Sequence, residues 1–219
     1  MREPLHGGTG LSQGTKLAIR CVLFFAGLFV LALGAVCMMQ AQLGVASWDV
    51  LHIGLTHLTS LSVGTWVQII GILMIAITCL IERKWPRIGS IVNIVMIGFF
   101  INWLLSLNLV PVYPFLWARV VMLLVGIVLM GFGAGMYVAS NIGAGPRDGL
   151  TLVLAERSGW SIRMVRTILE GTALLLGWLA TGPVSVGTFA SVLLIGPVMQ
   201  ASLRFWRKRM EKLAAAAVS

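Results

Sequence analysis

Six apolar runs, each long enough to cross a lipid bilayer, constrain this chain more than any other feature. They cover residues 21–40, 62–81, 88–107, 117–140, 162–180 and 187–203. As a helix, about 20 apolar residues span a hydrocarbon core roughly 30 Å thick. Charged residues make up only 11% of the chain, whereas soluble domains carry about 25%. The sequence therefore predicts an all-α integral membrane protein with six transmembrane helices, and its first partner is the lipid bilayer.

Two further segments, residues 49–59 and 149–158, are too short to cross. At ~1.5 Å per residue, the first reaches only about 17 Å. Each follows a break in the apolar pattern, and these breaks begin at Gln42 and Asn141. We predict two short re-entrant or broken helices.

The basic residues orient the chain. If both short segments return to the side they entered from, all of the 16 Lys and Arg residues except Arg119 lie on the side of the two termini. If both crossed instead, Arg83, Lys84, Arg87 and Arg147 would move to the opposite side. The positive-inside rule favours the first arrangement, with both termini cytoplasmic. The net charge of +9 is thus explained by orientation, and we expect no nucleic-acid partner.

A weak internal repeat relates the two halves. At a constant offset of 99 residues, Gly34 matches Gly133 and Asp49 matches Asp148. These two are the chain's only Asp residues, and both follow a break. Three spans per copy would invert the second copy in the membrane, which is the architecture of many transporters. We predict a polar cytoplasmic tail (1–20), membrane repeats 1 (21–108) and 2 (117–206), and a basic, Ala-rich cytoplasmic tail (207–219).

The motifs GVASWDVLH (residues 44–52) and GAGPRDG (143–149) resemble those of the YczE/YitT-like family of bacterial integral membrane proteins. The resemblance runs from Arg20 to Arg207, and Ser47 stands where relatives often have Pro. It implies a bacterial cytoplasmic (inner) membrane protein. It supplies no catalytic or substrate-binding residues to carry over.

The second break carries the first group of candidate site residues. Gly143 and Gly145 permit close backbone approach, Pro146 suits a first helical turn, and Asp148 complements the helix dipole. One hypothesis is a substrate or ion site at a half-helix start, where Arg147 favours an anionic group. The alternative is a structural turn in which Asp148 caps its own helix and pairs with Arg147.

The other candidates lie on the first short segment and the fifth run. Asp49 and His52 share a helix face and could relay protons or bind a cation. The favoured alternative is a capping Asp with an interfacial His. Arg166 and Glu170 are spaced for an ion pair, which either contacts substrate or only fixes helix packing.

We expect a transporter or channel-like permease for a small, unidentified solute, anionic if Arg147 binds it. The alternative is a non-transporting scaffold or regulator of a partner protein. No catalytic signature is present in the sequence, so we expect no enzyme activity and no cofactor. The Asp and His residues do not have the spacing of a metal site. The sequence does not indicate an oligomeric state.

Overall fold

The described part of the chain is all-helical. The computed structural model describes residues 13–143 and 145–215. Its helices are α1 (Gln13–Ala41), α2 (Ser47–Leu58), α3 (Val63–Glu82), α4 (Ile88–Ser106), α5 (Leu116–Ala139), α6 (Pro146–Ser158), α7 (Ile162–Leu179) and α8 (Val186–Ala215). The predicted all-α class is confirmed, and every predicted run or short segment corresponds to one helix.

Two helix boundaries differ from the prediction. Helix α1 begins at Gln13 rather than near Cys21, and α8 continues to Ala215 rather than ending near Leu203. Both extensions are rich in Ala, Leu, Lys and Arg, which are good helix formers. An apolar run therefore marks the length suited to lipid, not the length of the helix. The remaining parts of the predicted tails, residues 1–12 and 216–219, lie outside the described residues.

Five helices, α1, α3, α4, α5 and α8, are long and apolar enough to cross a membrane. Helices α2 and α6 have 12 and 13 residues. Helix α7 has 18 residues but carries Arg163, Arg166 and Glu170. These three charged residues make it too polar to count among the candidate membrane spans. The molecule is thus a helical membrane protein, and its sixth span stays a prediction.

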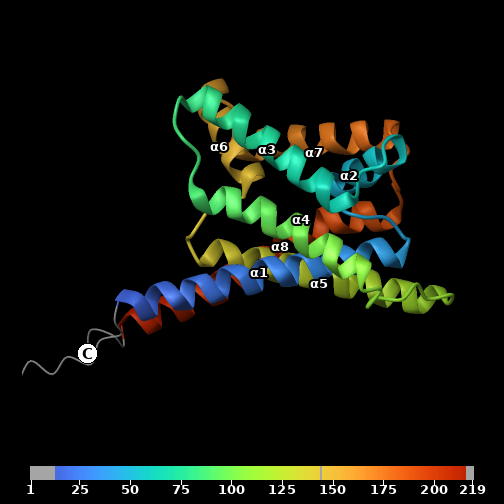
Figure 1. Ribbon diagram of the computed structural model, residues 1–219, viewed down its shortest axis with the longest axis horizontal. Coiled ribbons are helices and arrows are strands. Elements are labelled where there is room, and N and C mark those ends of the chain that lie inside the picture. Colours follow the sequence, from blue (N-terminus) through green and yellow to red (C-terminus); the bar gives the residue numbers. More distant parts are fainter. Residues whose placement is uncertain (1–12, 144, 216–219) are drawn as a thin grey trace, which may run out of the picture.

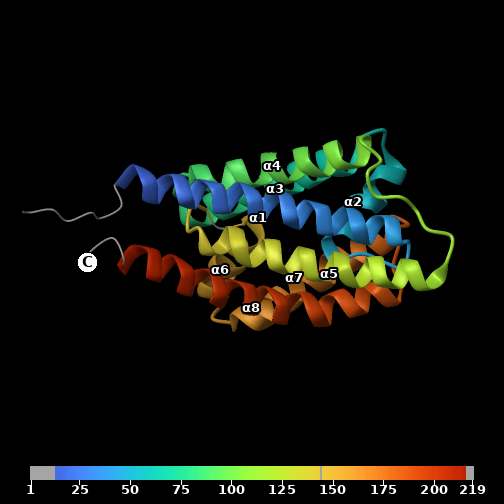
Figure 2. The same cartoon turned by 90° about the horizontal axis from the view of Figure 1, so that it is seen from below.

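The helices form two groups that lie beside each other and extend along the long axis of the molecule (Figure 1). Helices α1, α5 and α8 run side by side, and α5 packs against both neighbours (Figures 1 and 2). In the second group α2 packs against α7 and α3 packs against α6, while α4 joins the groups through α1 and α3. The short helices α6 and α2 lie at opposite ends of this group, and α1 begins at the end where α8 finishes (Figure 1).

The centre of the fold is a close antiparallel crossing of α1 and α5. A Cβ at Gly34 would lie 2.5 Å from Met130 N, and one at Gly126 would lie 2.9 Å from Gly34 O. Gly27 and Gly133 make the same reciprocal approach. Small residues allow helix backbones to meet in a membrane, where packing rather than hydrophobicity drives association.

Candidate functional site

The two breaks have related backbone geometry. Each begins with a non-glycine residue in the left-handed region, Gln42 at φ 52° and Asn141 at φ 56°. The N-cap residues of α2 and α6 are Ala46 and Gly145, which have no side chain able to accept a capping hydrogen bond. The free N–H groups at such helix starts favour anions.

Each break packs against the start of a long helix from the other half of the chain. The N–H of Gly187 donates to Leu43 O at 2.8 Å. At the second break, a Cβ on Gly143 would lie 2.7 Å from the Cα of Gly89. Gly143, predicted as a site residue, therefore serves this close approach and does not line the cavity described next.

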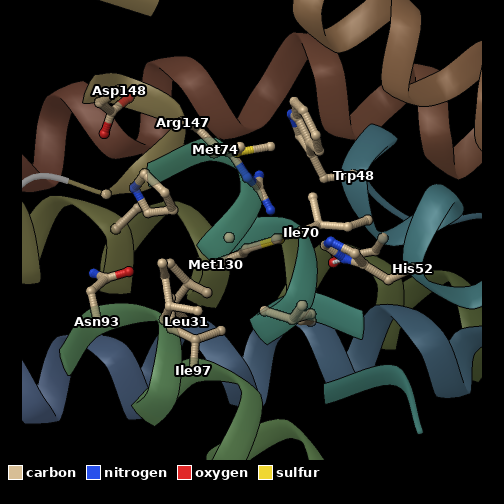
Figure 3. Close-up of a pocket in the computed structure, with 18 of the residues that line it drawn as sticks. Leu31, Trp48, His52, Ile70, Met74, Asn93, Ile97, Met130, Arg147 and Asp148 are labelled. Carbon is tan, nitrogen blue, oxygen red and sulfur yellow. Dashed lines mark ion pairs between the residues drawn. The ribbon is translucent and has the colours of Figure 1, made fainter. Parts of the chain in front are cut away.

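A cavity of about 140 Å³ lies between the two breaks. Apart from Gly143, all the predicted site residues line it: Asp49, His52, Gly145, Pro146, Arg147, Asp148, Arg166 and Glu170. They come from α2, α6 and α7, and from the residue that precedes α6. Figure 3 shows Arg147 and Asp148 across the cavity from Asn93, Leu31 and Ile97. Residues far apart in the sequence thus meet around one space.

Several polar atoms in this cavity lack partners. Asp49 and His52 are each 2% exposed, and His52 Nδ1 lies 3.4 Å from Asp49 Oδ1. That contact does not have the geometry of a hydrogen bond. Asp49 Oδ2 and His52 Nδ1 therefore have no hydrogen-bond partner in the described structure. Asn93 Nδ2, in a side chain that is also buried, has none either. Buried polar groups are nearly always satisfied, so these atoms are available to a bound solute or to water.

Arg147 lines the cavity and lies against an aromatic ring. Its guanidinium carbon lies 5.1 Å from the centre of the Trp48 ring, a cation–π distance. Among the described residues it makes no ion pair, neither with Asp148 nor with another carboxylate. Arg166 and Glu170 do approach each other, with Nε and Oε1 3.9 Å apart, and are 53% and 30% exposed. A pair this far apart and this exposed contributes little stability.

Sequence reasoning missed Asn93 as a site residue. It lies within the apolar helix α4, and a polar side chain in such a helix is by default a functional candidate. The same helix contains Asn102, whose Oδ1 accepts from Gly64 N at 2.9 Å. Only the structure separates the satisfied amide from the unsatisfied one.

Most cavity-lining residues come in pairs separated by the 99-residue offset. The polar pairs are Asp49 with Asp148 and His52 with Thr151, and Trp48 is paired with Arg147. The apolar pairs include Leu31 and Met130, Ala35 and Ala134, and Ile70 and Leu169. Both halves of the chain therefore contribute equivalent positions to one cavity.

Besides Trp48 and Arg147, two further pairs differ in charge. Val67 and Gly71 on α3 correspond to Arg166 and Glu170 on α7, and all four residues line the cavity. The 99-residue offset therefore relates these lining residues in position but not in chemistry, since only the α7 side carries these charges.

The fold and this cavity define a polytopic helical membrane protein with a partly polar interior. Residues 18–204 match the family of unknown function DUF6198. The chain is 36% identical over 189 residues to the uncharacterized membrane protein YczE of Bacillus subtilis, covering 86% of this chain and 87% of that protein. The chain belongs to this YczE-like family.

Two more relatives show the same extent of similarity. An uncharacterized protein of Haemophilus influenzae is 33% identical over 185 residues, which is 82% of this chain and 80% of the relative. The uncharacterized protein YyaS of Bacillus subtilis is 28% identical over 174 residues, with 79% and 87% covered. No solved structure matches the chain.

Proposed function

We propose that this protein is a permease of the bacterial cytoplasmic membrane and that the cavity between the two breaks binds its solute. The observation that carries the proposal is the set of buried, unpartnered polar atoms of Asp49, His52 and Asn93 inside that cavity. A scaffold would have no use for them, because an unsatisfied buried polar group costs about 1–3 kcal/mol.

An inverted repeat accounts for the helix pairing. Under the 99-residue offset, Gly27 corresponds to Gly126 and Gly34 to Gly133. An internal two-fold axis would exchange the residues of each such pair. It would therefore relate the Gly27–Gly133 contact to the Gly126–Gly34 contact, and both contacts are present. The same operation turns the pairing of α2 with α7 into that of α6 with α3, also present. Transporters of this design bind solute at the repeat interface, at broken helices.

Helix α7 serves as the sixth span in this proposal. Its three charges lie in its N-terminal half, and its C-terminal half exposes Leu175, Leu176, Trp178 and Leu179. Exposed apolar side chains suit lipid, while Arg166 and Glu170 line the cavity. Six crossings also place the start of α1 and the end of α8 on one side, in agreement with their common end of the molecule (Figure 1).

The cavity limits the solute to a small one. Its volume of about 140 Å³ is close to that of an engineered cavity of roughly 150 Å³ that holds benzene. Arg147, a cation without an ion pair, favours an anionic group, because a planar guanidinium binds carboxylate or phosphate in bidentate fashion.

A thermal-shift screen of small solutes on the purified protein tests the proposal. Binding to the native state raises the unfolding midpoint. A cognate solute should stabilise the parent and lose most of that effect in Arg147→Gln and Asn93→Leu. A solute that stabilises both variants as well as the parent would remove these residues from the site. A core that binds nothing would favour the scaffold or regulator.

A further inference from the structure

A second hollow of about 710 Å³ lies beside the cavity, between α3 and α7. We call it the lateral groove, and its walls include Leu55, Ile69, Leu73, Leu150, Leu176 and Leu179. Among the described residues that line it, Thr172 alone has a side-chain hydroxyl, and that hydroxyl donates to Ile168 O at 2.8 Å. The groove therefore offers a ligand almost no polar partner.

The lateral groove and the cavity share a wall. Trp48, Ile70 and Met74 line both spaces. Figure 3 shows these side chains on the same side of the cavity as Arg147. Arg147 lies against the Trp48 ring at 5.1 Å. Because Trp48 also lines the lateral groove, a cation without an ion pair lies next to this groove.

This arrangement matches one ligand chemistry better than its simpler alternatives. A small inorganic anion would occupy the cavity and leave the lateral groove unused. A bilayer lipid tail would occupy the groove and leave Arg147 without an anion. A molecule with an anionic head and an apolar tail satisfies both, since its head can reach Arg147 while its tail follows Trp48, Ile70 and Met74 outward.

We propose that the solute is a single-chain amphiphile with an anionic head, bound with the head at Arg147 and the tail in the lateral groove. This inference rests on the proposed permease function and specifies its substrate class. It also explains why the cavity is small, because most of the ligand would lie outside it.

The test uses the full-length protein in nanodiscs of neutral phosphatidylcholine, with inorganic phosphate, butyl phosphate and hexyl phosphate as probes. Apparent affinities come from the thermal shift against aqueous probe concentration. Burial of a methylene group improves affinity about fourfold, so hexyl phosphate, with two more methylenes, should bind roughly sixteenfold more tightly than butyl phosphate. Hexyltrimethylammonium, with the same tail and the opposite charge, should give no comparable shift.

Two tryptophan variants locate the tail. Leu73 lines the lateral groove and Ile72 does not, yet each is 57% exposed on α3. Leu73→Trp should fill the groove and remove the difference between hexyl and butyl phosphate, whereas Ile72→Trp should retain it. Arg147→Gln should weaken all alkyl phosphates at least tenfold.

The outcomes separate this inference from the proposed function. Equal binding of inorganic and hexyl phosphate would overturn the amphiphile but keep a small-anion permease. A tail-length effect that survives Leu73→Trp would place the tail elsewhere and also overturn it. Absence of binding by every phosphate probe would overturn the anionic amphiphile, and the wider solute screen would then decide the permease.

Discussion

Asp49 combines deep burial with an incomplete set of partners. It is 2% exposed, and its Oδ2 accepts no hydrogen bond in the described structure. A buried polar group without its full set of hydrogen bonds disfavours folding. Sites that bind ligands often hold destabilising groups of this kind, and their removal trades function for stability.

Asp49→Asn should therefore raise the free energy of unfolding, by about 1 kcal/mol, while it removes a carboxylate from the cavity. Thermal unfolding of the purified protein measures the effect, with the exposed Glu156→Gln on α6 as a control expected to change little. A loss of stability in Asp49→Asn would instead identify the carboxylate as a structural group.

Arg119 has a role that the sequence did not predict. Its Nε donates to Ala41 O at 2.8 Å and its Nη2 donates to Gln42 O at 2.6 Å. Both carbonyls lie where α1 ends and the first break begins. The only basic residue expected on the non-cytoplasmic side thus fixes the end of a helix.

Arg119→Gln should destabilise the protein by about 2 kcal/mol, because hydrogen bonds to charged groups contribute about 1.5–3 kcal/mol. Arg119→Lys should lose less, since an ammonium group keeps the charge but not the two-pronged geometry. Denaturant unfolding checks the order. Equal stability of parent and Arg119→Gln would show that the first break is held by its other contacts.

The α1–α5 crossing is the main structural constraint at the scale of the elements. Gly34 has Met130 N and Gly126 O within 2.7 Å of the position of its missing Cβ. Gly171, on α7, has no atom of the described residues within 4 Å of that position. Both glycines lie inside helices, so they differ in packing and not in backbone conformation.

Gly34→Ala should therefore destabilise the fold by about 1–3 kcal/mol through overpacking. Gly171→Ala should be neutral or stabilise it by up to about 1 kcal/mol, because Ala is the better helix former. The unfolding midpoints of the two variants give the comparison. Equal midpoints would mean that the backbones of α1 and α5 can move apart without loss of stability.

Labelling of single cysteines can decide whether α7 crosses the membrane. The variants Lys84→Cys, Ser161→Cys and Val184→Cys each carry a single cysteine once the three native cysteines are replaced. A membrane-impermeant thiol reagent is added to one side of sealed vesicles at a time. We expect Lys84 and Ser161 on the cytoplasmic side and Val184 outside, because α7 begins after Ser161 and ends at Leu179. Labelling of Ser161 and Val184 from the same side would show that α7 does not cross.

Helix positions could be predicted from the sequence because apolar runs and Gly or Pro breaks are local signals. The short segments were expected at 49–59 and 149–158 and were found as Ser47–Leu58 and Pro146–Ser158. The contacts within the cavity were not predictable in this way. The approach of Trp48 to Arg147 and the missing partner of Asn93 depend on how distant helices pack.

In the whole molecule, one cavity is lined by residues from both halves of the chain. Pairs such as Asp49 and Asp148 are separated by 99 residues and line the same space. The offset was visible in the sequence, but identity between the halves is low. The lateral groove had no sequence signal at all, because its walls are ordinary apolar residues of four helices.

In a permease, solvent and solute enter the cavity, and labelling of a cysteine that lines the cavity tests this without knowledge of the solute. Ala134 lines the cavity, whereas Ala173 packs behind the cavity wall, in a hydrophobic cluster with Trp48 and Met74, and does not line it; they are 8% and 1% exposed. In the cysteine-free background, a small membrane-impermeant thiol reagent should label Ala134→Cys from both sides of sealed vesicles and Ala173→Cys from neither. Failure to label Ala134→Cys from either side would show a closed core and contradict the permease.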